Sequence, residues 1–166
     1  DSARQTLRRL MNGTVPNSLA AVRLGMIEES SGNYPAAIAA FKKALETRTG
    51  DWVSLNDLAY CLILAGQRDE ALKYAQQAKE IAPDNPFVND TLGWAFYNKG
   101  MYESAVAQLE PLRNGPSAAH RYHLAMAYFK RGDAERGKQI LDAAHSMDPT
   151  RAEAIMAQQT ADEATR

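Results

Sequence analysis

The chain has 166 residues, about the length of one domain, and 45% of them are hydrophobic, which is enough for a core. Lys and Arg number 19 against 20 Asp and Glu, and the formal net charge of −1 argues against nucleic-acid binding through bulk charge. The mean hydropathy of −0.44, with no apolar run near the roughly 18–20 residues of a membrane helix, argues against membrane insertion. The single cysteine, Cys61, excludes an intrachain disulfide and leaves the compartment open between cytosol and periplasm.

A period of about 34 residues runs through the chain. Four glycines mark it, separated by 34, 34 and 32 residues: Gly32, Gly66, Gly100 and Gly132. Three more columns of small or apolar residues keep the same register: Leu24, Leu58, Leu92 and Leu124; Gly25, Ala59, Gly93 and Ala125; Ala37, Ala71, Ala105 and Gly137. Because independent columns share one register, the sequence predicts an array of repeated units.

Each unit is predicted to form two helices. In the unit at 52–85, Leu55, Leu58 and Leu62 follow the spacing of an amphipathic helix. Gly66 ends that helix, and a second helix follows until Pro83. The small residues of the columns allow the two antiparallel helices to approach closely.

The period predicts the order of segments along the chain. These are a partial repeat and turn at 1–17, repeats at 18–51 and 52–85, a shortened repeat at 86–117, a repeat at 118–151, and a C-terminal capping helix and tail at 152–166. Ala3, Leu7 and Leu10 fall on second-helix columns, so we expect 2–11 to be half of an upstream repeat and the chain to be a fragment of a longer array. Gln158 and Gln159 replace core residues in the last segment, which is typical of a polar cap.

The third and second units carry a known pattern. The third unit reads Asn89-x₂-Leu92-Gly93-x₂-Phe96 followed by Ala105-x₃-Leu109, and the second closes on Pro83-Asp84-Asn85. This pattern resembles the tetratricopeptide repeat (TPR). The resemblance implies an all-α fold, a right-handed α-solenoid of antiparallel helix pairs with about nine to ten helices.

Three departures from the family pattern are visible in the sequence. The first Trp of the pattern is missing from every unit, and Glu28 stands where the first unit should have an aromatic residue. Pro111 is expected to shorten the second helix of the third unit, which is two residues short.

Catalytic and metal-binding signatures are absent from the sequence, so we expect no enzyme activity, cofactor or metal. His120 and His123 are separated by one helical turn, but no third ligand accompanies them, and they are interpreted as ordinary surface or groove residues. Cys61 is expected to be a buried, inert thiol. The carboxylates are interpreted mostly as a solvated face that offers no acid/base pair.

The TPR resemblance implies a concave groove lined by the first helices. The groove residues predicted to bind a partner are aromatic or polar, with one methionine: Asn56, Asp57, Tyr60, Phe87, Asp90, Trp94, Tyr97, Asn98, Tyr122, His123 and Met126. The resemblance also places Met26, Glu29, Ser30 and Leu64 on this face. Aromatic rings give large contact area at low entropic cost, so the sequence predicts a module that binds a partner protein as a peptide or helix.

The sequence leaves alternatives to peptide binding open. Some of the aromatic side chains could simply pack between helices, and the array could be a scaffold that self-assembles through its terminal repeats. Asp90-Thr91-Leu92-Gly93-Trp94 faintly resembles bacterial envelope TPR proteins linked to polysaccharide export, which adds glycan binding as an alternative. TPR co-chaperones hold a C-terminal carboxylate through Lys, Asn and Arg residues at fixed repeat positions. That set of residues is missing from this sequence, so the co-chaperone subclass is not expected.

Overall fold

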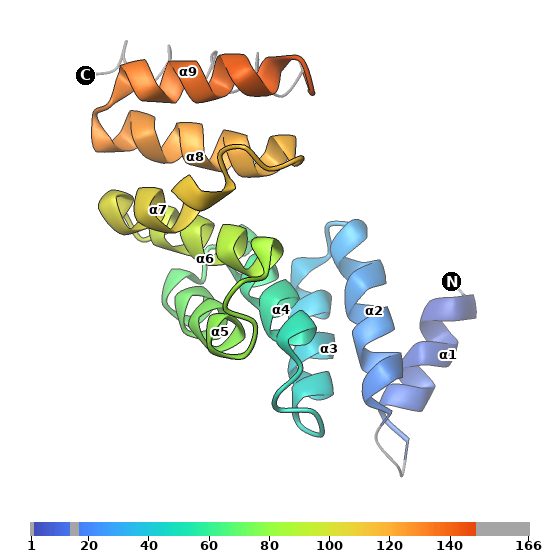
Figure 1. Ribbon diagram of the computed structural model, residues 1–166. Coiled ribbons are helices and arrows are strands. Elements are labelled where there is room, and N and C mark those ends of the chain that lie inside the picture. Colours follow the sequence, from blue (N-terminus) through green and yellow to red (C-terminus); the bar gives the residue numbers. More distant parts are fainter. Residues whose placement is uncertain (1, 14–16, 149–166) are drawn as a thin grey trace. The chain divides into compact units, whose positions relative to one another are not determined.

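The computed structural model describes residues 2–13 and 17–148, and all regular structure in those ranges is helical (Figure 1). The helices are α1 (Ser2–Met11), α2 (Ser18–Ser30), α3 (Tyr34–Leu45), α4 (Trp52–Leu64), α5 (Arg68–Ile81), α6 (Pro86–Asn98), α7 (Tyr102–Leu109), the 3₁₀ helix η1 (Glu110–Leu112), α8 (Ala118–Arg131) and α9 (Ala134–His145). The predicted all-α fold is therefore confirmed. The capping helix predicted at 152–166 lies outside the described residues.

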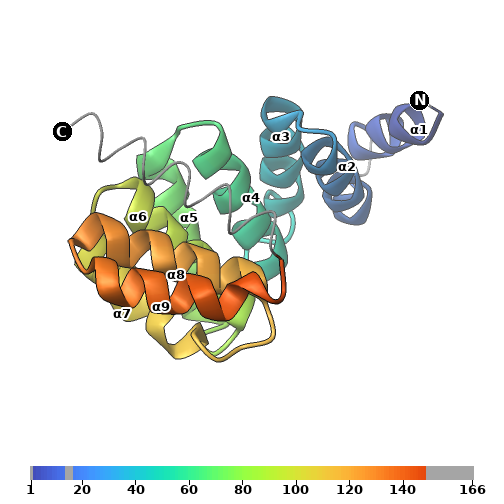
Figure 2. The ribbon, with the colours of Figure 1, turned by 90° about the horizontal axis from the view of Figure 1, so that it is seen from above.

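The chain forms two compact units, residues 1–95 and 96–166, and their boundary falls within α6. In the first unit α1 packs on α2, α2 pairs with α3, α3 packs on α4, and α4 pairs with α5 (Figures 1 and 2). In the second unit α7 packs on α8, and α8 pairs with α9. Pairs of neighbouring helices therefore build both units, as the period predicts.

Helix ends follow local sequence signals. Asn17 caps α2, since its side-chain oxygen accepts the Ala20 N–H at 3.0 Å, and Asp133 caps α9 in the same way. After α4, Gly66 has a φ of +75°, a conformation that lets the chain turn and that side chains with a Cβ rarely adopt. The α-helix α7 stops at Leu109 and gives way to the 3₁₀ turn that contains Pro111, so the predicted shortening is confirmed.

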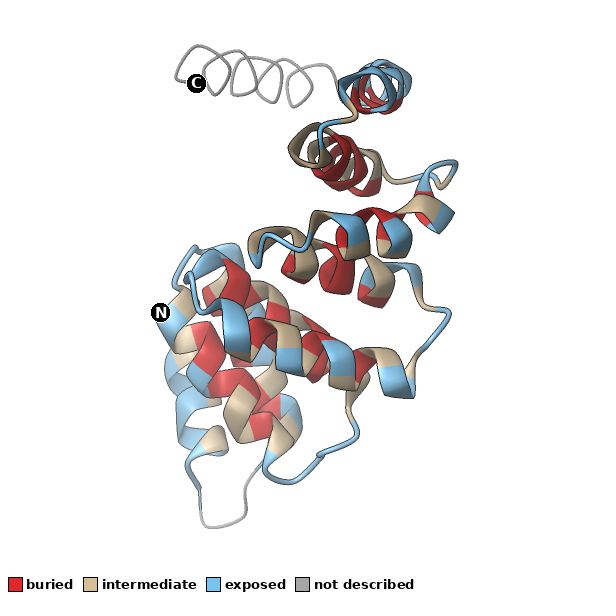
Figure 3. Cartoon of the chain, turned by 90° about the vertical axis from the view of Figure 1, so that its left-hand side faces the viewer, coloured by how far each residue is buried: buried red, intermediate tan, exposed pale blue. Residues whose placement is uncertain are grey.

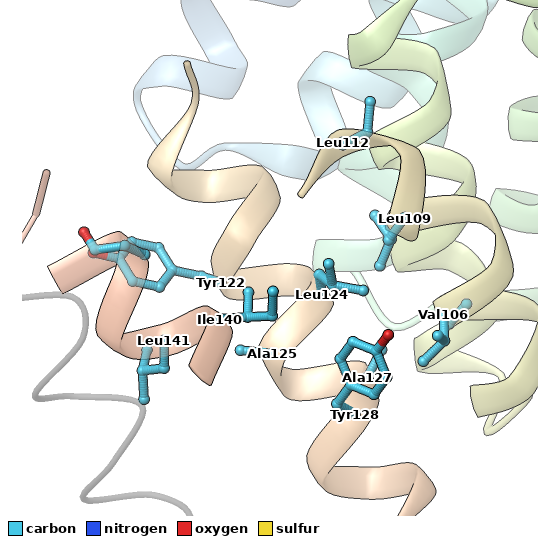
Figure 4. Packing of buried hydrophobic residues seen from close by; sticks show 12 residues of the cluster. Val106, Leu109, Leu112, Tyr122, Leu124, Ala125, Ala127, Tyr128, Ile140 and Leu141 are labelled. Atoms are coloured by element: carbon cyan, nitrogen blue, oxygen red, sulfur yellow. The ribbon is translucent and has the colours of Figure 1, made fainter. Parts of the chain in front are cut away.

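Buried residues lie along the sides of helices that face their neighbours within each unit (Figure 3). In the first unit the ring of Phe41 on α3 is fully buried against Gly25 of α2, which has no Cβ to hold it off. In the second unit Leu109 of α7, Leu124 of α8 and Leu141 of α9 belong to one apolar cluster (Figure 4). The small residues of the repeat columns thus permit close helix packing, as predicted.

Glu28 replaces the family's aromatic residue and is buried, with 3% of its side chain exposed. Arg8 of α1 donates to its carboxylate at 2.9 Å, Arg4 forms an ion pair with it at 3.3 Å, and Asn33 donates to it at 2.9 Å. A buried charge is tolerated when it is paired and hydrogen-bonded in this way. The ion pairs of Glu28 with Arg4 and Arg8 therefore link α2 to α1.

Candidate functional site

A pocket of about 440 Å³ opens on the first unit where α2 and α4 meet the start of α3. Its lining residues come from all three helices: Met26, Glu29 and Ser30 of α2, Tyr34 of α3, and Asp57, Tyr60 and Leu64 of α4. Spacings of three and four residues place side chains on the same face of a helix, which is how α2 and α4 each present three groups to the pocket. The pocket combines aromatic, aliphatic and acidic side chains.

Two of the lining groups are carboxylates whose charges interact. Burial and the nearby charge of Asp57 raise the pKa of Glu29 from 4.5 to about 7. Burial also raises the pKa of Asp57, although a hydrogen bond from Asn56 opposes this effect. The Cys61 thiol donates to Glu29, and its pKa is raised to about 12 by burial and by the two carboxylates. The thiol is thus buried and protonated, as expected for an inert cysteine.

Within the described residues, neither Glu29 nor Asp57 forms an ion pair with a basic side chain. Glu28, one residue from Glu29, has two arginine partners, and Glu70 is paired with Lys42 at 2.7 Å. The acidic pair of the pocket is therefore a site of uncompensated negative charge. The carboxylates were predicted to lie mostly on a solvated face, and this partly buried pair is an exception to that pattern.

The side chain of Asn56 adds an unsatisfied acceptor beside this pair. Its Nδ2 donates to Oδ1 of Asp57 at 3.2 Å, whereas its own Oδ1 is buried and has no hydrogen-bond partner among the described residues. Buried polar atoms are nearly always hydrogen-bonded in native proteins. Asn56 is 9% exposed, so it supports the pocket from within the protein instead of lying on an open groove as predicted.

The structure brings only some of the predicted groove residues together. Asp57 and Tyr60 line the pocket, with Asn56 beside them. On α6, Phe87 is 62% exposed while Asp90 and Trp94 are partly buried, and none of the three lines this pocket.

The second unit holds the remaining predicted residues. Tyr97, Asn98 and Met126 are partly buried. Tyr122 belongs to the apolar cluster and His123 is a buried polar residue, which corrects their predicted place on an open groove, and His120 is buried as well. The Tyr122 hydroxyl donates to the carbonyl oxygens of Ala144 and Asp148 near the end of α9, and its ring lies between α8 and α9 (Figure 4).

Of the seven pocket residues, only Asp57 and Tyr60 were predicted to bind a partner. The TPR resemblance placed Glu29 on the same face, with Met26, Ser30 and Leu64, but did not select it, and it did not place Tyr34 there at all. Glu29 occupies the twelfth position of one repeat and Asp57 the sixth position of the next, so the repeat register contains the signal that these columns meet. Tyr34 begins a second helix, and the groove prediction considered first helices only.

Two further features concern residues 2–13 and 17–148, the part of the chain that the structure describes. No group of three or more His, Cys, Asp or Glu side chains is placed to hold a metal ion in that part of the chain. Among the same residues, no helix combines the length and the apolar character needed to cross a membrane.

Solved structures with the same fold cover most of the chain. Residues 41 to the end of MamA from Desulfovibrio magneticus RS-1 superpose with a TM-score of 0.74 at 17% identity, covering 90% of this chain and 87% of that one. TTC0263, a thermophilic TPR protein of Thermus thermophilus, gives 0.78 at 20% identity, with 89% and 83% covered. YrrB, described as a TPR protein with an unusual peptide-binding site, gives 0.73 at 21% identity, with 95% and 84% covered. These likenesses show the α-solenoid fold of TPR proteins.

Sequence comparison identifies the family directly. Small glutamine-rich tetratricopeptide repeat-containing protein 2 of Mycosarcoma maydis is 35% identical over 77 residues, or 46% of this chain, and the match spans 22% of that relative's length. Two patterns described as tetratricopeptide repeat match residues 30–90 and residues 1–51 with 91–152. The chain belongs to the tetratricopeptide repeat family.

Proposed function

We propose that this chain is a protein-interaction module and that the pocket between α2 and α4 binds a segment of a partner protein. The proposal rests on one observation above all: an open pocket, lined by two tyrosines, two exposed aliphatic side chains and two carboxylates, lies on a face formed by first helices. The repeats proposed at 18–51 and 52–85 supply the residues that line this pocket. The peptide-binding site described for YrrB is consistent with this use of the fold.

The lining residues suit contact with a peptide. Met26 is 52% exposed and Leu64 is 40% exposed, so a bound segment would cover apolar surface that now faces water. Tyr34 and Tyr60 each combine a large ring with a polar end, the side-chain type enriched at binding hot spots. Tyr60 is central to the proposal because it lies on the same helix as Asp57, one turn away.

A peptide selection tests this proposal. The full chain is used to select binders from a phage-displayed library of random peptides, and selected peptides are then synthesised and titrated against variants. Tyr60→Ala should weaken binding by about tenfold or more, as truncation of a hot-spot residue does. The matched control is Tyr74→Ala, because Tyr74 lines a separate hollow of the same unit formed by α3, α4 and α5.

Both variants must retain the helical circular dichroism spectrum of the wild type. Equal weakening by Tyr60→Ala and Tyr74→Ala, or unchanged binding in Tyr60→Ala, would overturn the proposed site. Failure to select any peptide would also count against it, and would favour the alternatives of self-assembly through the terminal repeats or glycan binding.

A further inference from the structure

We infer that the pocket holds one cationic side chain, a lysine or arginine of the partner peptide, between the carboxylates of Glu29 and Asp57. This inference rests on the proposed function and adds the chemistry of the residue that is recognised. The basic residue of the peptide would also contact apolar groups, because the same pocket presents Met26, Leu64 and two tyrosine rings.

Charge complementarity favours a cationic ligand. The carboxylates approach from two helices that the chain packs together, and their charges interact across the pocket. None of the seven lining residues is basic. The nearby arginines of α1, Arg4 and Arg8, are held on Glu28 instead. A lysine or arginine from outside would supply the counter-charge that the described part of the chain does not.

Hydrogen-bonding capacity points the same way. The Ser30 hydroxyl already donates to the Ile27 carbonyl at 3.0 Å, which leaves its oxygen available as an acceptor. The carboxylates of Glu29 and Asp57 are acceptors when ionised. A site rich in acceptors selects a ligand rich in donors, and ammonium and guanidinium groups are donors only.

The apolar part of the lining fits the rest of such a side chain. Lysine and arginine have aliphatic stems that pack on apolar surface while the charged end reaches polar groups. Met26 and Leu64 offer that surface. The rings of Tyr34 and Tyr60 can in addition attract a cation held over their faces.

The ionisation of the pocket makes the affinity depend on pH. The titratable groups that line or contact the site are Glu29 of α2, Tyr34 of α3, and Asp57, Tyr60 and Cys61 of α4, and the charge of Asp51 acts on Asp57. Because the pKa of Glu29 is about 7, a cation must displace a proton from it at lower pH. Affinity for a cationic peptide should therefore rise by about tenfold between pH 6 and pH 8.

The test is a double-mutant comparison with defined peptides. A peptide selected by the full chain and sensitive to Tyr60→Ala is synthesised with its lysine or arginine, and again with norleucine at that position. The wild type should bind the cationic form at least about tenfold more tightly, a preference of the size of a hot-spot contact. Chains with Glu29→Gln and Asp57→Asn together should bind both forms with nearly equal affinity.

A matched control removes one negative charge elsewhere. Glu80→Gln lies in the separate hollow of the same unit and should preserve the preference for the cationic peptide. If peptides bind at Tyr60 without any preference for a basic residue, or if their affinity does not change with pH, the inference is overturned while the proposed function stands. If no peptide depends on Tyr60, both fail.

Discussion

The same repeat column has different roles in the two units. Glu29 and Phe129 occupy equivalent positions of their repeats. Glu29 lines an open pocket, whereas Phe129 packs against the apolar cluster of the second unit and against Gly137. A second column repeats the contrast, because Asp57 lines the pocket while its equivalent, His123, is buried. The period therefore identifies a column, and the local packing decides whether it serves binding or stability.

The largest expected effect comes from truncating this column in each unit. Phe129→Ala should lower the free energy of unfolding by about 2–3 kcal/mol, because it removes a ring packed on the core. Glu29→Ala should leave the stability unchanged or raise it, since it removes an unpaired, partly buried charge. Urea unfolding followed by circular dichroism measures both. Equal losses in the two variants would contradict the difference in role.

Two glycines sharpen the comparison. A Cβ at Gly25 would lie 2.7 Å from the ring of Phe41, which is fully buried, and one at Gly137 would lie 2.6 Å from the ring of Phe129, which is partly exposed. Gly25→Ala should lower stability by about 2 kcal/mol, because the buried ring has no room to retreat. Gly137→Ala should cost about 1 kcal/mol or less, since the ring can shift and alanine favours the helix.

Thermal melting of the two glycine variants checks this order. A larger loss of stability for Gly137→Ala than for Gly25→Ala would show that the exposure of the facing ring does not determine the cost.

The third expected effect has the opposite sign, a gain of stability from neutralising the pocket. The pKa of Glu29 is about 7 in the folded protein against its usual 4.5, so the folded state holds this proton more tightly than the unfolded state. The corresponding stabilisation is present below pH 4.5 and is lost as the pH rises to 7. At pH 8, Glu29→Gln should therefore be more stable than the wild type by about 1–2 kcal/mol, with partial exposure of the group taken into account.

Urea unfolding of wild type and Glu29→Gln at pH 4 and pH 8 measures this gain. The difference should be close to zero at pH 4, where the carboxyl is protonated in both states. A difference that is the same at both pH values would show that the carboxylate charge is not its cause.

The fold was predictable because it depends on local and periodic signals. The spacing of Leu55, Leu58 and Leu62 marks a helix, and Gly66 marks its end, and both appear at those places in the structure. The pocket was predictable only in part. Asp57 and Tyr60 were selected, but Glu29 lies 28 residues from Asp57, and their interaction depends on how two repeats pack.

Burial was the property that the sequence did not determine. Tyr60 and Tyr122 are both tyrosines on first helices, yet only Tyr60 lines an open pocket. The Tyr122 hydroxyl has partners near the end of α9, and these carbonyl groups carry no signature in the sequence. Aromatic content alone therefore does not distinguish a residue of the binding surface from a residue of the core in a helical repeat.

The titration of the Glu29 carboxyl tests the uncompensated acidic pair most directly. It can be followed by ¹³C NMR of the side-chain carboxyl carbon in the full chain, with Asp57→Asn as the comparison. We predict a pKa of about 7 in the wild type, and a lower value in Asp57→Asn because one cause of the increase is removed. A pKa near 4.5 in the wild type, or no change in the variant, would contradict the acidic pair and remove the basis for cation recognition.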